Sequence, residues 1–193
     1  MIIFDLDGTL ADCEHRRHFI EPPEDHCGLC YDFLIDKDKN KDFNQVCLCG
    51  RQPGIWKKDF KSFYEACDED SVIQQVQETF ISMLHEPYNR EVQIWSGRCE
   101  SMRNKTLKWL DDQIFSNSES IEYINRKLKM RPIGDNKPDD QLKERRLDDY
   151  IDSMGNQYSH HINFVFDSDP SSIRMWRRRG IFVFNCCQHE GEF

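Results

Sequence analysis

The chain of 193 residues lacks several features that would place it in a membrane or nucleotide-binding class. Its apolar runs are all shorter than the roughly 18 residues that a membrane-spanning helix needs, and its mean hydropathy is -0.78. No Gly-x-x-x-x-Gly-Lys-Ser/Thr loop occurs, which excludes a P-loop. Positive charge is scarce, because 26 Lys and Arg face 35 Asp and Glu, for a net charge of -9. That charge argues against tight, sequence-independent wrapping of nucleic acid.

Cysteine, in contrast, is abundant, with nine residues. The count is odd and the chain is long enough for a folded core, so we expect reduced thiols in a cytoplasmic protein and not a disulfide scaffold. The first apolar run starts at Met1, which predicts neither a signal nor a transit peptide. We expect no membrane association, and the oligomeric state is left open.

The order of apolar and amphipathic segments predicts an α/β fold with a mainly parallel sheet. Runs rich in Ile, Val and Phe are expected to form strands at 1–5, 91–96, 162–167 and 181–186, with a short strand ending at 130–132. Helical spacing predicts helices over 58–67, 70–85, 99–112, 139–153 and 170–179. We expect one domain over 1–193, interrupted at 20–57 by a Cys-rich insertion that follows the first motif.

The first strand runs directly into Asp5-Leu6-Asp7-Gly8-Thr9. Residues i and i+2 of a strand lie on the same side, so the two carboxylates are expected together at the carboxyl end of the sheet. Such a pair is stabilised by a cation or a shared proton. An ordinary Asp-Gly hairpin is the alternative, whereas a calcium loop needs Gly and Glu at other positions. The pattern favours a Mg²⁺-dependent phosphoryl-transfer site with an aspartate nucleophile.

Polar residues follow three further strands. Ser96-Gly97-Arg98 could bind a phosphate or form a simple turn, and Asp139 and Lys143 share a helical face that could hold a surface ion pair. Asp167 ends an apolar strand and could complete a hard-cation site.

Together these motifs resemble the haloacid dehalogenase (HAD) superfamily, and within it the phosphatase domains of the bacteriophage polynucleotide kinase/3′-phosphatase family. The resemblance covers nearly the whole chain except 20–57. It is carried by Asp5–Leu10 with Arg16, Trp95–Arg98, Arg131 through Lys143, Asp167 through Gly180, and the closing 190–193. It implies a three-layer Rossmann-like fold and, if the source is a phage, a place in the host cytoplasm.

The resemblance also implies a division of labour. Asp5 would be the nucleophile and Asp7 the general acid and base. Mg²⁺ would be held by the Asp5 carboxylate, the Asp7 carbonyl and Asp167. Ser96 and Lys143 would bind phosphoryl oxygens.

Four further positions match the family. Arg16, Arg98 and Arg131 would contact the substrate, and Asp139 would support Lys143. One departure stands out: the family has a second acidic residue after Asp167, where this chain has Ser168 followed by Asp169. Asp169 could recover that role.

The insertion carries two cysteine pairs, Cys27 with Cys30 and Cys47 with Cys49. If a hairpin brings the pairs together they would form a structural Zn²⁺ site, and the alternative is four reduced thiols on a loop.

The expected function is a Mg²⁺-dependent phosphomonoesterase acting on 3′ ends of nucleic acid or on nucleotides. A phosphatase of free nucleoside monophosphates or another small metabolite is the first alternative. The second is a non-catalytic zinc-dependent interaction module on a HAD scaffold.

Overall fold

The computed structural model describes residues 1–21, 58–85, 90–116, 118–154 and 162–187. It divides the chain into a large unit, Met1–Glu14 with Cys67–Phe193, and a small unit, His15–Ala66. Residues 22–57 of the predicted insertion lie outside the described residues. No helix in the described part is both long and apolar enough to cross a membrane.

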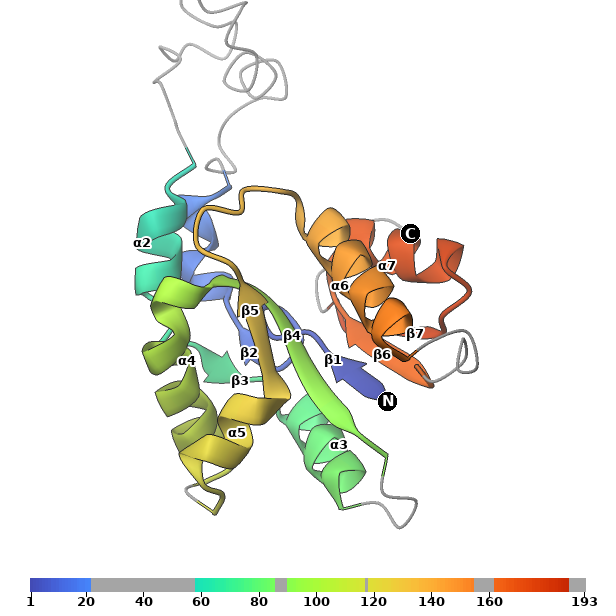
Figure 1. Cartoon of the computed structure of the whole chain (residues 1–193). Helices are drawn as coiled ribbons and strands as arrows, with labels where there is room; N and C mark the ends of the chain where they lie inside the picture. The colour runs from blue at the N-terminus through green and yellow to red at the C-terminus, as the bar shows by residue number, and fades with distance from the viewer. Residues whose placement is uncertain (22–57, 86–89, 117, 155–161, 188–193) are drawn as a thin grey trace, which may run out of the picture. The chain divides into compact units, whose positions relative to one another are not determined.

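A parallel sheet of five strands forms the centre of the large unit (Figure 1). Its order is β5-β4-β1-β6-β7, with β1 at Ile2–Phe4, β4 at Val92–Cys99, β5 at Leu128–Arg131, β6 at Phe164–Asp167 and β7 at Val183–Asn185. The central strand β1 pairs with β4 and β6, and its register sets Phe4 beside Ile94 and Phe166. The predicted α/β fold is confirmed, and β1 is buried on both faces as a parallel strand should be.

Helices cover both faces of this sheet (Figure 1). On one face lie α3 (Gln74–Leu84), α4 (Arg103–Trp109), the π-helical turn η4 (Leu110–Ile114) and α5 (Ile121–Lys127). On the other lie α6 (Asp139–Met154) and α7 (Pro170–Arg178). A short 3-10 turn, η3 (Glu100–Met102), links β4 to α4. A small antiparallel pair, β2 (Ala11–Asp12) and β3 (Ser71–Val72), lies outside the main sheet.

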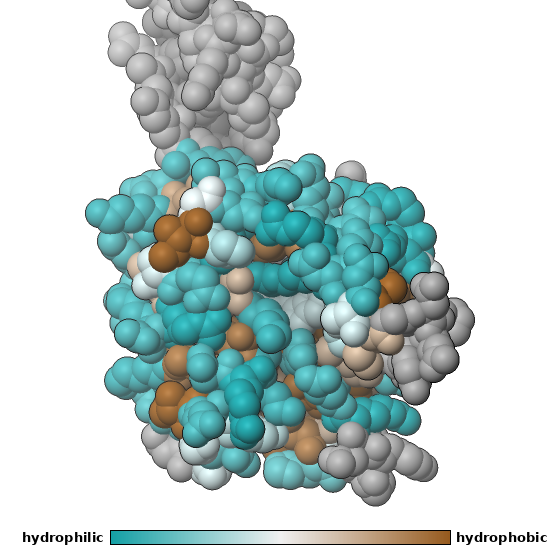
Figure 2. Space-filling model, in the orientation of Figure 1, coloured by the Kyte–Doolittle hydropathy of each residue, from teal (hydrophilic) through white to brown (hydrophobic). Residues whose placement is uncertain are grey.

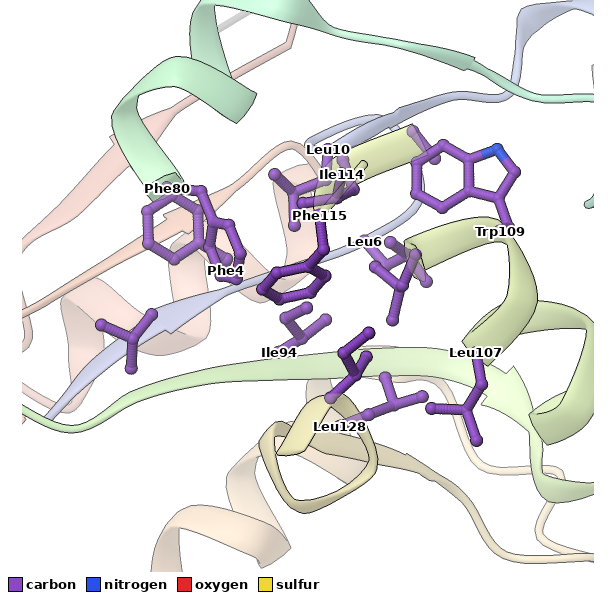
Figure 3. Close-up of a cluster of buried hydrophobic side chains, with 14 of the residues drawn as sticks. Phe4, Leu6, Leu10, Phe80, Ile94, Leu107, Trp109, Ile114, Phe115 and Leu128 are labelled. Carbon is purple, nitrogen blue, oxygen red and sulfur yellow. The ribbon is translucent and has the colours of Figure 1, made fainter. Parts of the chain in front are cut away.

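Alternation along the strands sorts the core into two clusters. Phe4, Ile94 and Phe166 face α3, α4 and α5, where Figure 3 shows Phe4 close to Phe80 and Leu128 close to Leu107. Ile3 and Val165 face α6 and α7, where they pack with Leu147 and Trp176. Alternate residues of the same strands therefore pack against the two helical layers, and this fixes the register of the strands.

Two expected helices differ from the structure. The segment predicted as a helix over 70–85 begins as strand β3, and α3 starts only at Gln74. The polar residues Asp68 to Ser71, which could have capped a helix starting at 70, do not cap α3, because its N-cap is Ile73. The helix expected over 99–112 is split between η3, α4 and η4. Tertiary contacts of the polar residues, described next, account for the first difference.

The small unit contains η1 (Glu14–Phe19), which begins at the last residue of the large unit, and α2 (Phe60–Glu65). The Asp59 amide donates to the Phe19 carbonyl at 2.8 Å, and Asp59 also caps α2 through the amide of Ser62. These two contacts join the segments on either side of the insertion.

Candidate active site

The predicted site residues gather where the parallel strands end. Asp5 follows β1, Ser96 and Arg98 lie in the last part of β4, Arg131 ends β5 and Asp167 ends β6. Carboxyl ends of parallel strands share one edge of a sheet, which is where α/β proteins bind ligands. Because strand β1 ends at Phe4, the alternation of strand residues does not determine where the side chains of Asp5 and Asp7 lie. Their hydrogen-bond and ion-pair partners determine it.

Lys143 joins two of the predicted carboxylates. Its Nζ lies 3.0 Å from Oδ1 of Asp5 and 2.9 Å from Oδ2 of Asp167, and all three side chains are buried. The indole Nε1 of Trp176 also donates to Oδ2 of Asp167 at 2.9 Å, and the Asp169 amide donates to Oδ1 at 3.1 Å. Asp167 is therefore held in one orientation by three donors from two helices and a turn.

Burial and the charges of neighbouring side chains together set the pKa values in this cluster. It raises the pKa of Asp5 well above the usual range, with Lys143 opposing and Asp167 adding to the rise. Burial alone would lower the pKa of Lys143, but the carboxylates of Asp167 and Asp5 outweigh it and raise that pKa. Lys143 is thus a permanent cation, and one ammonium serves two buried carboxyl groups. The remaining negative charge is favourable only with a further cation or a proton nearby.

Asp7 is held by a different cation. Nε and Nη2 of Arg98 donate to its Oδ1 at 2.9 and 2.6 Å, and Nη2 also lies 2.5 Å from Oδ2 of Asp70. Arg98 is fully buried, while Asp7 is about one-fifth exposed. The indole Nε1 of Trp109 donates to the Asp70 carbonyl at 2.8 Å and so fixes the loop that carries Asp70. The carboxylate of Asp7 therefore has a rigid support and remains open to solvent.

The segment Ser96-Gly97-Arg98 is organised by its own backbone. Oγ of Ser96 accepts from the Arg98 amide at 3.0 Å, and no residue in the described ranges accepts the hydroxyl proton. The Ser96 carbonyl accepts from Nη1 of Arg146 at 3.1 Å. A Cβ on Gly97 would collide with the carboxylate of Asp139, so only glycine allows that approach. This leaves the Ser96 hydroxyl with a donor for an anionic oxygen.

Arg131 and Asp139 form a structural pair beside it. Nη2 of Arg131 donates to the Asp139 carboxylate, Nε donates to the Gly97 carbonyl at 2.8 Å, and Nη1 to the Lys137 carbonyl at 2.5 Å. Arg131 thereby fixes the loop between β5 and α6. The expected pair of Asp139 with Lys143 is seen only at longer range, where Asp139 contributes to the raised pKa of Lys143.

Arg16 belongs to the small unit. Its guanidinium is buried, donates through Nη1 to the Phe63 carbonyl at 3.0 Å and lies over the Phe63 ring at 4.1 Å. These contacts tie η1 to α2, and they are described within that unit alone.

The residues after β6 have separate roles. The carboxylate of Asp169 accepts from the Ser172 amide at 2.8 Å and caps α7, so its hydrogen bonds are those of a helix cap. Oγ of Ser168 donates to the Asp7 carbonyl at 3.2 Å and lies 2.5 Å from where a Cβ on Gly8 would be. Gly8 has a φ of 76°, which favours glycine at this turn.

The four cysteines predicted to bind zinc, Cys27, Cys30, Cys47 and Cys49, lie outside the described residues. Within the described part of the chain, no group of three or more His, Cys, Asp or Glu side chains could hold a metal ion. Any metal held here must take other donors as well, such as backbone carbonyl oxygen.

Three supporting residues were not found from the sequence. These residues are Asp70, Trp176 and Arg146. Trp176 is fully buried, although Arg177 to Arg179 follow it directly in the sequence. Its hydrogen bond to Asp167 could have been suspected, because a buried indole N–H needs an acceptor.

Comparison with known proteins agrees with the fold. A family model described as the phosphatase domain of polynucleotide kinase PNKP matches residues 55–193, which includes Ser96, Lys143 and Asp167 but not Asp5. A comparison with curated protein sequences finds no match.

Two solved structures share the fold. "Structure of the Pnkp1/Rnl/Hen1 RNA repair complex" superposes with a TM-score of 0.53 at 18% identity, over 95% of this chain and 41% of that one. "Structure of Pnkp1/Rnl/Hen1 complex" gives 0.55 at 20% identity, over 96% and 44%. The chain thus spans less than half the length of either neighbour. Because the family match covers well over half of its residues, the chain belongs to the polynucleotide kinase PNKP phosphatase-domain family, with a HAD fold.

Proposed function

We propose that the chain is a Mg²⁺-dependent phosphomonoesterase that removes the 3′-phosphate from a nucleic-acid end through an aspartyl-phosphate. The observation that carries this proposal is the buried Asp5 carboxylate paired with Lys143, beside an Asp7 carboxylate that Arg98 holds open to solvent. These are the parts that covalent phosphoryl transfer needs: a nucleophile, a cation for the phosphoryl group and a proton carrier.

In the first step an oxygen of Asp5 forms a bond to phosphorus while the bond to the leaving oxygen breaks on the opposite side. The Lys143 ammonium and the Ser96 hydroxyl donate to phosphoryl oxygens, which concentrates positive charge where negative charge accumulates. Lys143 also keeps the Asp5 carboxylate oriented, because the contact of 3.0 Å joins the two side chains before substrate arrives.

Asp7 acts as the general acid in the first step and as the general base in the second. A phosphate dianion bound beside it raises its proton affinity, so the protonated form can supply the leaving oxygen. Once the alcohol leaves, the Asp7 carboxylate takes a proton from water, which attacks phosphorus and frees Asp5. The Arg98 contact of 2.6 Å keeps the Asp7 carboxylate in place for that second step.

The donor set suits Mg²⁺. Asp5 and Asp167 are buried carboxylates that share a single ammonium, and the Asp7 carbonyl is a further oxygen donor nearby. Mg²⁺ prefers oxygen donors and uses one or two protein carboxylates together with water and phosphate. When bound, Mg²⁺ neutralises charge on the transferring group.

The first test is phosphate release with Mg²⁺ from four substrates: a 3′-phosphorylated oligonucleotide, its 5′-phosphorylated counterpart, and free 3′- and 5′-mononucleotides. We expect the 3′-phosphorylated oligonucleotide to be preferred, and chelation of Mg²⁺ to abolish release. Asp5→Asn should lower turnover by at least about a thousandfold, since the nucleophile is lost. Thermal unfolding of that variant checks that the fold is kept.

Other outcomes select the alternatives. Preference for a free mononucleotide would indicate a nucleotide phosphatase, which the net charge of -9 favours. No phosphate release from any of the four substrates would support a non-catalytic interaction module. Unchanged turnover in Asp5→Asn would overturn the aspartyl-phosphate mechanism.

A further inference from the structure

A hollow of about 340 Å³ lies beside the candidate site, and we call it the β5 trough. Its lining comes from β4, β5, the start of α4 and α6, and includes Trp95, Arg103, Lys129, Arg146, Asp149 and Tyr150. The volume lies in the range of small-ligand sites. A second hollow of about 440 Å³, lined by α3 and η4, contains Glu78 and Glu119 but no Lys or Arg. Of these two hollows in the described part of the chain, the trough therefore has the charge to attract an anion.

Arg146 connects the trough to the site. It follows Lys143 by three residues, so the two side chains leave the same face of α6, with their Cβ atoms about 5 to 6 Å apart. Nη1 donates to the Ser96 carbonyl, whereas Nη2 is buried and has no hydrogen-bond partner in the described part of the chain. Burial lowers the pKa of Arg146 to about 10, so it stays a cation at neutral pH. The positive charge of Arg146, which lines the trough, favours an anion at this end of it.

The charges of the trough favour a nucleic-acid strand. Lys129 is exposed and makes no ion pair with any described residue, whereas Arg103 is paired with Glu100 at 2.6 Å. Asp149 is the opposing charge on the other wall. Three cations against two carboxylates make the trough net positive in a chain of net charge -9. A partly buried tyrosine ring, that of Tyr150, adds a surface for a sugar or base.

We propose that the β5 trough binds the nucleotide that precedes the 3′-terminal one, with Lys129 on its backbone phosphate and Tyr150 on its sugar or base. This rests on the proposed phosphatase function and gives it a length requirement: a mononucleotide reaches Lys143 but leaves the trough empty. Figure 1 shows β4 and β5 side by side in the large unit, α6 contacts β4, and the face drawn in Figure 2 is mostly hydrophilic.

The test compares kcat/KM for a 3′-phosphorylated dinucleotide with that for a 3′-mononucleotide. Lys129→Gln should lower the ratio of the two values about fivefold, mainly through KM for the dinucleotide. The salt dependence of dinucleotide binding should fall by about 0.7 in slope, as for one lost phosphate contact. Asp149→Asn should raise the ratio, because it removes the opposing charge.

Lys127→Gln is the matched control. It removes the same charge two residues away, where Nζ lies over the Tyr123 ring at 5.1 Å and lines neither hollow. An unchanged ratio in Lys129→Gln, with the wild type active on both substrates, overturns the trough and leaves the phosphatase proposal standing.

If the wild type releases phosphate from neither substrate, the proposed function fails and the trough is tested by binding. Fluorescence titration with a labelled 3′-phosphorylated dinucleotide then decides. Weaker binding by Lys129→Gln than by Lys127→Gln supports the trough, and equal binding overturns it.

Discussion

Buried ionic contacts determine how single residues of the site are held. Arg98 donates to Asp7 and Asp70 together, so Asp70 supports the proposed proton carrier without contacting the substrate. A buried arginine that loses one of two carboxylate partners keeps its desolvation cost and loses part of its compensation. Asp70 is therefore a positioning residue whose loss should be felt in both stability and turnover.

We expect Asp70→Ala to lower the free energy of unfolding by about 3 kcal/mol, measured by urea denaturation. Turnover should fall about tenfold with a small change in KM, because Asp7 loses its fixed orientation. Asp70→Asn keeps an acceptor and should retain more of both.

The control variant is Asp68→Ala, since Asp68 lies in the same loop as Asp70. Asp68 pairs with Lys105 at 3.1 Å, and both side chains are nearly half exposed. Asp68→Ala should cost less than about 1 kcal/mol and leave kcat near the wild-type value. Equal effects of the two variants would contradict a special role for Asp70.

At the scale of elements, the start of α7 accounts for Asp169, the acidic residue that follows Ser168 after β6. Asp169 is the N-cap of α7 and Pro170 is its first residue, a combination that starts a helix strongly. Its pKa is affected first by burial, which raises it, but hydrogen bonds from Ser171 and Ser172 outweigh burial and lower it. The carboxylate is thus committed to the helix end.

This assignment predicts how Asp169 variants behave. Asp169→Asn preserves a good cap and should keep near wild-type turnover at saturating Mg²⁺, whereas Asp169→Ala should cost about 1 kcal/mol of unfolding free energy. Ser120→Ala, which removes the cap of α5, provides a stability control. A marked rise in the Mg²⁺ requirement of Asp169→Asn would instead show that Asp169 serves the metal.

The arginine-rich end of α7 also acts between elements. Arg179 donates to Asp148 at 2.6 Å and to Glu144 at 3.2 Å, and Arg178 donates to Glu144 at 2.8 Å. These pairs join α7 to α6, so much of this basic cluster is neutralised locally.

At the scale of the whole molecule, the net charge of -9 requires that substrate anions meet concentrated local cations. Under the proposed function, Lys143 together with a bound Mg²⁺ would provide them at the sheet edge, and the β5 trough would add further positive charge. Distribution of charge, and not its total, decides whether a polynucleotide end can bind.

The prediction at this scale concerns the cysteine-rich segment. If Cys27, Cys30, Cys47 and Cys49 form a zinc site, metal analysis of the purified protein should give one zinc per chain. Cys27→Ser with Cys30→Ser should abolish it, and Cys99→Ser, outside the cluster, should not. Zinc retained by the double variant would place the metal elsewhere.

The sequence by itself determined the parallel sheet and the motif at its edge. The apolar runs at 1–5 and 162–167 are typical of buried strands and end in Asp5 and Asp167, so the positions of these carboxylates depend on local order along the chain.

Tertiary structure alone decided how these side chains pair. Arg98 and Asp7 are 91 residues apart, and Lys143 reaches Asp5 only because α6 packs against the sheet. The π-helical turn η4 and the strand start at Ser71 likewise override local helical spacing. Hydrogen bonds between distant residues depend on where strands end and helices pack, and that information is spread over the whole chain.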